Sequence, residues 1–349
     1  MFELFNKGIK YVFGGYSKNS DIRFESTSGG AFSLIADVYC DGNYVIFGAE
    51  ADGLDVFHSY ITDICDISKY RKSKYSQSKM GSCYEDCMKF LKSGKKVLFS
   101  GTPCQIAGLK LFLNMTNTDM TKLLTVEVIC EGVPSPLYIR KYEESLFIKF
   151  GRKVEKLDYR YTGKSYFNYG KWDFQVMKTK LVNDDREIIL DRWFNPFWWI
   201  WINHLMSRPV CYKCPFAKQD RVADITLGDL WGIHLFCPEL YENNMGSSLI
   251  VSNTDKGMSV VKKAQKKMYG HKLNFEDALK YQSPMRNHIS MNESRYEFMQ
   301  DLKSNMTYEK INKKWVKMPS LKLLWQKYIW GNRQKIEFWK LTKGKYKIR

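Results

Sequence analysis

The chain has 349 residues, of which 44% are hydrophobic and 15% aromatic, with 55 Lys and Arg against 37 Asp and Glu. This length and composition exclude a disordered, collagen-like or low-complexity chain and provide enough apolar material for a large core. The nine cysteines are odd in number and scattered, and no apolar run typical of a signal peptide opens the chain. We therefore expect a cytoplasmic protein rather than a secreted disulfide scaffold.

The positive charge is concentrated near the end of the chain. Residues 301–349 hold 14 Lys and Arg against 3 Asp and Glu, which is most of the net charge of +18. Aromatic residues alternate with these lysines, a pattern typical of a segment on an anionic membrane, of a nucleic-acid contact or simply of a solvated basic helix. Of these, we do not favour nucleic acid. The apolar run at 194–205 is too short to span a bilayer and is predicted to be a buried or interfacial helix.

Short apolar runs alternating with turn residues predict a mixed α/β fold. A strand, a Gly-Thr-Pro turn, a helix and a further strand follow one another, which indicates that some strands are parallel. The predicted elements are strands at 44–48, 96–100, 123–130, 224–232 and 248–253, and helices at 83–91, 105–113 and 256–268.

Residues 150–195 interrupt this pattern with aromatic residues separated by Gly and Lys, and with few helix formers. They are predicted to form short strands or hairpins inserted into the fold. We expect one large domain with a mixed sheet over residues 1–290, followed by a basic, aromatic-rich helical tail over 291–349.

Cysteine spacing carries the strongest chemical signal. Cys211 and Cys214 form a C-x-x-C pair followed by proline, and two such thiolates can bind one metal ion or cluster from a tight turn. Cys104 and Cys130 both lie at the carboxyl ends of predicted strands, the edge where α/β folds place ligands. The four together would suit a [4Fe–4S] cluster or zinc. The alternative is that Cys104 and Cys130 are small buried hydrophobic residues.

The other cysteines and the histidines carry less signal. Cys83 and Cys87 lie one turn apart in a predicted helix with no histidine nearby. Cys40, Cys65 and Cys237 are predicted to be packing residues. The five histidines show no H-x-x-x-H or H-E pairing, which argues against a histidine-based zinc enzyme.

Two loops of small residues could bind phosphate. The segment 26–31 (STSGGA) directly precedes an apolar helical run, so its N–H groups can face a dinucleotide pyrophosphate, although a plain helix cap is the alternative. Gly101 and Thr102 form a second loop of this kind. Asp229 and Trp231 mark a strand end where a planar ring could stack, or else a tight turn with a core tryptophan.

Seven motifs in order resemble the coenzyme F420 hydrogenase/dehydrogenase beta-subunit family. They span about residues 20 to 265 and read SGGA, SKYxQS, GTPCQ, CxGVPSP, CxxCPFA, RxxDITxGDxWG and GxSLIxxNTxxG. The resemblance implies an oxidoreductase with one large cofactor-binding domain that contains FAD and a [4Fe–4S] cluster. It implies electron transfer between an organic small-molecule substrate and a ferredoxin-like donor, a deazaflavin donor or a partner subunit, with coenzyme F420 as a further candidate cofactor.

The resemblance also assigns residues. Its cluster ligands are Cys104, Cys130, Cys211 and Cys214. Its flavin contacts are Thr27, Ser28, Gly29, Gly30, Gly101, Thr102 and Gln105, with Asp229 and Trp231 as further candidates.

Two departures from the family pattern matter. Family members often carry an N-terminal ferredoxin-like segment with clustered cysteines, whereas the first cysteine here is Cys40, so we expect an external electron donor. The usual Cys-His-Gly is replaced by Cys130, Glu131 and Gly132. Two other functions stay open: a non-redox binding protein in which four cysteines hold a structural zinc ion, and a membrane-surface accessory protein of glycan assembly with peripheral membrane contact through the basic tail.

Overall fold

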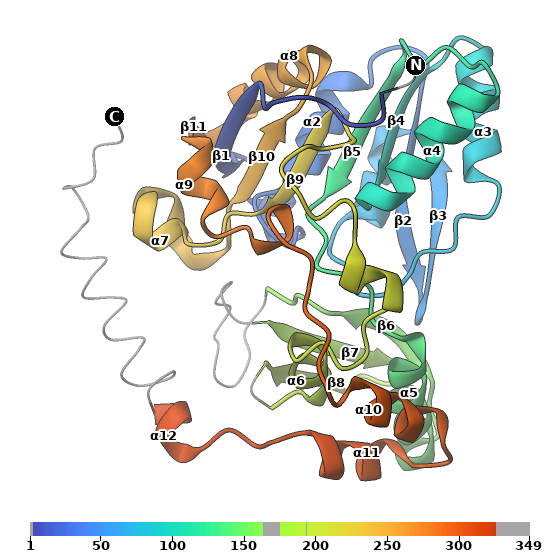
Figure 1. The fold of residues 1–349 in the computed structure, drawn as a ribbon, viewed down its shortest axis with the longest axis vertical. Coiled ribbons are helices and arrows are strands. Elements are labelled where there is room, and N and C mark those ends of the chain that lie inside the picture. Colours follow the sequence, from blue (N-terminus) through green and yellow to red (C-terminus); the bar gives the residue numbers. More distant parts are fainter. Residues whose placement is uncertain (1–2, 163–174, 193, 326–349) are drawn as a thin grey trace.

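The computed structural model describes residues 3–162, 175–192 and 194–325. Figure 1 shows a larger part built on an eight-stranded sheet and, below it, a smaller part built on a three-stranded sheet. The predicted mixed α/β fold is confirmed, including the strands inserted after residue 150.

The large sheet has the strand order β11-β1-β10-β9-β5-β4-β2-β3. β2, β4, β5 and β9 are parallel neighbours, and β1 runs in the same direction because β10 is antiparallel to both β1 and β9. The carboxyl ends of these strands therefore share one edge of the sheet. The strands are β1 (Tyr11–Ser17), β2 (Tyr44–Asp52), β3 (Asp55–Ile61), β4 (Lys96–Gly101), β5 (Leu123–Val128), β9 (Ile225–Asp229), β10 (Ser248–Ser252) and β11 (Met268–Lys272).

Helices cover both faces of this sheet. α2 (Ala31–Tyr39) and α8 (Asp255–Ala264) pack on one face, and α3 (Cys83–Lys92) and α4 (Pro103–Met115) pack on the other. The sequence of β4 explains how one strand serves both cores, because successive side chains of a strand point to opposite faces. Val97 and Phe99 lie in the core under α3 and α4, and Leu98 lies in the core under α2 and α8.

Short helical elements complete the larger part. They are α1 (Ser20–Phe24), η1 (Ile64–Tyr70), η2 (Pro209–Lys213), α7 (Ile233–Phe236), η3 (Pro238–Asn244), η4 (Gln265–Lys267), α9 (Phe275–Leu279) and η5 (Ser283–Met285). The helix predicted at 256–268 is wrong at its end. α8 stops at Ala264, and Met268 already belongs to the edge strand β11, where pairing with β1 overrides the local helical pattern.

The smaller part contains the antiparallel strands β6 (Val154–Asp158), β7 (Val176–Leu181) and β8 (Glu187–Asp191). Helices α5 (Pro136–Phe150), α6 (Pro196–Ile202), α10 (Arg295–Lys303) and α11 (Tyr308–Trp315) pack with them around an aromatic core, and α12 (Leu321–Leu324) follows. Phe197, Trp198 and Trp201 of α6 are buried in that core. The prediction of a buried helix within 194–205 is therefore confirmed.

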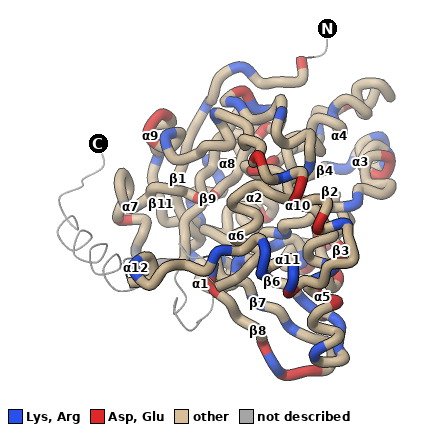
Figure 2. Tube along the Cα trace, turned by 60° about the horizontal axis from the view of Figure 1, so that its bottom comes forward, with Lys and Arg blue, Asp and Glu red and all other residues tan. Residues whose placement is uncertain are grey.

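The first part of the predicted tail packs into this core. Phe298 and Leu302 of α10 and Ile311 of α11 are buried among residues of α5 and α6. Figure 2 shows basic and acidic residues interspersed along the described chain. Within the described ranges, no helix combines the length and apolarity needed to cross a membrane. The predicted membrane contact depends largely on the basic residues 326–349, which lie outside the described residues. The division of the chain into a domain and a tail near residue 290 stays a prediction.

Candidate functional site

The predicted site residues gather at the carboxyl edge of the parallel strands, on the side facing the smaller part (Figure 1). Gly101 ends β4, Asp229 ends β9, and Cys130 follows β5 by two residues. All three positions follow from the sheet geometry, because each of these parallel strands ends at this edge and continues there into a loop. Residues far apart in the sequence are thereby brought to one line of loops.

The four predicted cysteine ligands lie in one neighbourhood. Burial raises the pKa of Cys130 to about 12, and the nearby thiols of Cys104, Cys211 and Cys214 add to that rise while a backbone hydrogen bond opposes it. Burial also raises the pKa of Cys211, again with contributions from Cys214 and Cys104. The structure thus brings together one thiol from the start of α4, one from the loop after β5 and two from the C-x-x-C turn.

Backbone pairing joins two of these loops directly. The N–H of Arg208 donates to the carbonyl of Val133, and the N–H of Ser135 donates to the carbonyl of Met206, both at 2.8 Å. Just before this pairing, Gly132 has a φ of +100°, and a Cβ added there would lie 3.2 Å from the Cβ of Cys211. A residue with a side chain would therefore be strained at this position and would crowd the C-x-x-C turn.

The number and type of the thiols bear on the kind of metal centre they could hold. Zinc–sulfur bonds of about 2.3 Å hold tetrahedral sulfur ligands roughly 3.8 Å apart. Among the described residues, no three of these Sγ atoms lie within 4.8 Å of one another. A four-iron cluster has a wider ligand spacing than a single ion and takes four thiolates. Four thiols from three loops therefore match the number and type of ligands that a four-iron cluster takes.

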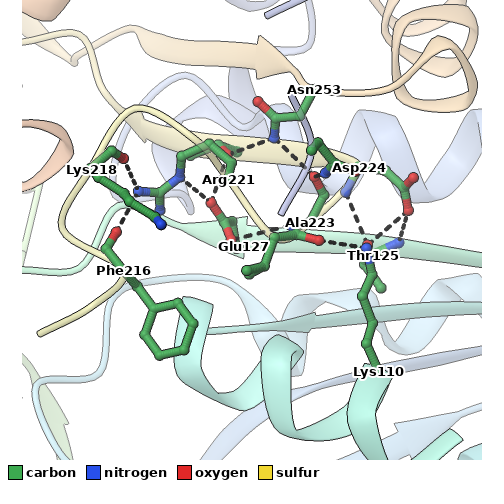
Figure 3. A network of polar contacts seen from close by, with 12 residues as sticks. Lys110, Thr125, Glu127, Phe216, Lys218, Arg221, Ala223, Asp224 and Asn253 are labelled. Carbon is green, nitrogen blue, oxygen red and sulfur yellow. Dashed lines mark hydrogen bonds and ion pairs between the residues drawn. The ribbon is translucent and has the colours of Figure 1, made fainter. Parts of the chain in front are cut away.

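A buried ion pair anchors the C-x-x-C turn to the sheet (Figure 3). The guanidinium of Arg221 pairs with the carboxylate of Glu127 on β5, and neither side chain is more than 2% exposed. Arg221 also donates from Nη1 to the carbonyls of Phe216 and Lys218, at 2.9 and 3.0 Å. This ion pair thus fixes the segment after Cys214 to β5, the strand that leads to Cys130.

The Ser-Gly-Gly loop packs against the start of β10. Ser28 Oγ donates to the carbonyl of Ser247 at 2.6 Å, and Gly29 N–H donates to Ser248 Oγ at 3.0 Å. A Cβ on Gly29 would lie only 2.3 Å from a backbone carbonyl of β1, so only glycine fits there. Gly30 precedes α2 with a φ of +81°, and no side chain caps the helix. The side chains hold the loop, and the first N–H groups of α2 are the groups suited to phosphate.

An open cavity of about 480 Å³ lies along the flank of α2. It is lined by α1, α2 and η1 together with basic side chains, among them Arg71, Lys266 and Lys267. None of the predicted flavin contacts lines it. We therefore do not identify this cavity with the predicted flavin site.

A buried arginine, Arg160, lies beside Asp229, where β9 ends at the carboxyl edge of the large sheet. Arg160 is 4% exposed, and its Nη1 donates to Asp229 Oδ2 at 3.0 Å and to the hydroxyl of Tyr75 at 3.4 Å. Its guanidinium carbon lies 5.6 Å from the centre of the Trp231 ring. Burial alone would lower the pKa of Arg160, but the carboxylate of Asp229 raises it, so the side chain is charged. Its Nη2 is buried and meets no hydrogen-bond acceptor in the part of the chain that the structure describes.

The Gly101 loop is built around the cap of α4. Gln105 Oε1 accepts a hydrogen bond from Thr102 N–H at 2.9 Å, which forms a capping box. The hydroxyl of Thr102 lies 3.2 Å from Cys104 Sγ. The two predicted flavin contacts therefore act locally to fix the helix turn that presents the first cysteine.

His58 was not singled out by sequence, yet it lies beside this loop. Its Nε2 is 3.0 Å from the carbonyl of Ser100 and its Nδ1 is 2.6 Å from Ser78 Oγ. Because a carbonyl can only accept, Nε2 carries the proton and Nδ1 accepts from the serine hydroxyl. Burial lowers the pKa of His58, in keeping with a neutral ring.

One extended segment, residues 73–80, touches each of these groups. Ser73 N–H donates to Thr27 Oγ1 at 2.8 Å in the Ser-Gly-Gly loop. Tyr75 contacts the buried arginine, and Gln77 accepts a hydrogen bond at 2.9 Å from Arg208, next to the cysteine loops. Further along, the hydroxyl of Ser78 forms a hydrogen bond with His58. The side-chain sulfur of Met80 accepts a hydrogen bond from the side-chain amide of Gln105. The segment thus contacts both the neighbourhood of the four cysteines, through Arg208, and the buried Arg160.

A family model matches residues 94–277, more than half of the chain, and describes the C-terminal region of the beta subunit of coenzyme F420 hydrogenase/dehydrogenase. The chain belongs to this coenzyme F420 hydrogenase/dehydrogenase beta-subunit family. The matched residues run from just before β4 to α9 and include all four predicted cluster ligands. The expected family is therefore confirmed, and with it the class of enzyme, since the family is named for oxidoreductases.

A solved structure is also similar to the chain. It is a chain of the F420-reducing [NiFe] hydrogenase complex from Methanosarcina barkeri, with 15% identity and a TM-score of 0.49, covering 90% of this chain and 94% of that one. A likeness this weak supports no statement about the site. No curated protein sequence matches significantly.

Some predictions about single residues in this family member need correction. Cys65 is exposed and is not a packing residue, because it lies in the 3-10 turn η1 with its side chain toward solvent. Cys104 is exposed as well, which excludes the alternative that it is a buried hydrophobic residue. Cys237 is buried as expected, but it lies beside Glu239 and His271, a grouping that the sequence spacing did not reveal.

Sequence reasoning missed Arg160 and Glu127, the two residues that organise the buried polar contacts of the site. Glu127 stands at a strictly buried position of a β-branched strand, and that conflict between charge and burial was the signal available in the sequence. Arg160 offered no such signal, since it lies in a segment rich in aromatic and basic residues.

Proposed function

We propose that the protein is an oxidoreductase that passes electrons between an organic substrate and a one-electron donor, using FAD and a [4Fe–4S] cluster. The donor would be a ferredoxin-like protein, a partner subunit or a deazaflavin such as coenzyme F420. When bound, the cluster supplies one-electron transfer and the flavin links it to two-electron chemistry.

The observation that carries this proposal is the grouping of four thiols, from three loops at one edge of the sheet, in a chain of this family. Cys104, Cys130, Cys211 and Cys214 would hold the cluster. Their loops are joined by backbone pairing and by the Arg221–Glu127 ion pair, so the thiols are held in place before any metal arrives. Preorganised ligands of this kind reduce the cost of ordering on binding.

The flavin would lie along the same carboxyl edge of the sheet, between the Ser-Gly-Gly loop and the turn at Asp229 that ends β9. The uncapped start of α2 suits a pyrophosphate. Arg160 offers a fixed positive charge and a buried donor without a partner among the described residues, which suits a carbonyl or anionic group of a bound ring. Trp231 and Tyr75 would limit the space beside it. The segment 73–80 would keep this site at a constant separation from the thiols.

The cellular setting proposed here is the cytoplasm, where thiols stay reduced, with peripheral membrane contact through residues 301–349 as a property of the basic segment. That contact is separable from catalysis. A chain lacking residues 326–349 should sediment less with anionic vesicles at low salt and should keep its cofactors, whereas unchanged sedimentation would remove the membrane proposal.

The test of the main proposal is metal and flavin analysis of the full chain purified without oxygen. We expect iron, acid-labile sulfide and flavin, with an absorption spectrum that bleaches on reduction. Cys211→Ser should lose most of the iron, because one of four cluster ligands is removed. Cys65→Ser is the matched control, since that cysteine is exposed and lies outside the four, and its iron content should be unchanged.

Two outcomes would contradict the proposal. Zinc in place of iron in the unmodified chain would support a structural metal site in a non-redox protein. Iron content that is the same in Cys211→Ser as in Cys65→Ser would remove these thiols from the ligand set.

A further inference from the structure

A second group of metal-binding side chains lies away from the four cysteines, at the outer edge of the large sheet. Cys237 ends α7 and precedes η3, Glu239 lies in η3, and His271 lies in β11, opposite Gly14 of β1. Their three ligand atoms, a sulfur, a carboxylate oxygen and a ring nitrogen, all lie within 4.8 Å of one another. Three kinds of donor from two separate elements thus meet at one point.

The separations of these atoms match those around a single ion. His271 Nε2 lies 3.3 Å from Glu239 Oε1, and Cys237 Sγ lies 3.7 Å from the same oxygen. In a tetrahedral zinc site, nitrogen and oxygen ligands lie roughly 3.3 Å apart and sulfur and oxygen ligands roughly 3.5 Å apart. Among the described residues, the four thiols at the other site show no such close spacing.

Hydrogen bonding alone leaves this group incomplete. Although His271 Nε2 and Glu239 lie within ion-pair distance, Nε2 forms no hydrogen bond, and Glu239 Oε2 is likewise buried without a hydrogen-bond partner among the described residues. Buried polar atoms normally have a partner, and a bound ion is one of the standard reasons for an exception. Both atoms are lone-pair donors of the type that a metal ion binds.

The chemistry of the donors indicates the class of ion. Thiolate, imidazole and carboxylate together are the ligands that zinc takes, whereas magnesium and calcium prefer oxygen ligands alone. The side chains of Glu239 and His271 are 33% and 40% exposed, so an ion can enter from solvent while the sulfur stays buried.

We propose that Cys237, Glu239 and His271 bind one divalent metal ion of the zinc class, separate from the four-cysteine site. Binding displaces the thiol proton of Cys237 to solvent, and the fourth position is taken by a water molecule. The ion fastens η3 to the edge strand β11. Because α7 and η3 directly follow Trp231, the same ion steadies the turn that leads out of the Asp229 corner.

The test uses Zn²⁺ as the probe on the full chain with its iron bound, after removal of loosely held metal by a chelator. We expect one zinc per chain and a higher unfolding temperature with zinc than without. His271→Gln and Cys237→Ser should each weaken zinc binding at least about 100-fold, since even outer-sphere partners of a metal site contribute 10- to 100-fold. Iron content should not change in either variant.

His271→Gln decides the result if Cys237→Ser does not fold, because the histidine is partly exposed on an edge strand. His288→Gln is the matched control, since that histidine is exposed and its ring forms a hydrogen bond with the neighbouring backbone carbonyl of Ile289. The proposal is overturned if zinc binds equally well to His271→Gln and His288→Gln, or if the unmodified chain takes up no zinc. It is also overturned if zinc binding disappears only in Cys211→Ser, which would place the ion at the other cysteines.

Discussion

Two buried arginines of the described chain, Arg221 and Arg160, each pair with a carboxylate at the same edge of the large sheet, and the pairs differ in one respect. Arg221 donates from Nε to Glu127 and from Nη1 to two backbone carbonyls, and over the described ranges none of its side-chain nitrogens is buried without a hydrogen-bond partner. Arg160 pairs with Asp229 and Tyr75, but its Nη2 is buried with no partner among the described residues. A buried charge is tolerated when it is paired and hydrogen-bonded, so the first pair is complete and the second is not.

This difference indicates different roles. The complete pair holds the C-x-x-C turn to β5, and among the described residues it has no buried donor left unpaired. The incomplete pair faces the corner that ends β9 and keeps a donor free, which is the property expected of a residue that awaits a bound molecule. Substitutions in the two pairs separate a structural role from a binding role.

The largest effect is expected from Glu127→Gln. The substitution leaves the guanidinium of Arg221 buried without a counter-charge, and removing one partner of a buried pair costs about 3–5 kcal/mol. The free energy of unfolding, measured by denaturant titration, should fall by that amount, with iron lost as the C-x-x-C turn loosens. Glu155→Gln is the matched control. It breaks a pair with Lys180 in which both side chains are more than 40% exposed, and it should leave stability unchanged.

A smaller and more selective effect is expected from Arg160→Lys. Lysine keeps the positive charge beside Asp229 but lacks the second planar donor. We expect FAD to bind about tenfold more weakly, as for the loss of one charge-assisted hydrogen bond, with stability changed far less than in Glu127→Gln. Fluorescence titration of the flavin measures this affinity.

Arg186→Lys serves as the control for this exchange, because Arg186 lies on the surface with 61% of its side chain exposed. If Arg160→Lys and Arg186→Lys bind FAD equally well, the free donor of Arg160 does not contact the flavin. If Arg160→Lys instead unfolds as readily as Glu127→Gln, the two arginines share a structural role and the contrast between them disappears.

The smallest effect concerns pH. Burial lowers the pKa of His58 in the folded state below the usual 6.5, so protonation favours the unfolded chain. The stability contributed by the neutral ring is complete above pH 6.5 and decreases as the pH falls below it, by at most about 1.4 kcal/mol per pH unit. His58→Gln should therefore show a shallower loss of stability between pH 6.5 and 5. Identical slopes in the two proteins would mean that His58 does not contribute to acid sensitivity.

Local patterns predicted most of the framework. The β-branched run of β5, the Gly-Thr-Pro turn before α4 and the aromatic run of α6 are each short-range signals, and each element forms where expected. The prediction failed where pairing decided the outcome. The helix predicted over 256–268 ends at Ala264 instead, and Met268 begins the edge strand β11, which pairs with β1.

The sequence by itself determined the family, the mixed α/β fold and the four thiols as a candidate set, since those depend on ordered motifs and on periodicities within a few residues. Only the tertiary structure decided which polar side chains work together. Glu127 and Arg221 are 94 residues apart, and Asp229 and Arg160 are 69 apart. The meeting of Cys237, Glu239 and His271 likewise depends on β11 pairing with β1. Burial and distance between such residues arise from sheet order, and sheet order is a property of the whole chain.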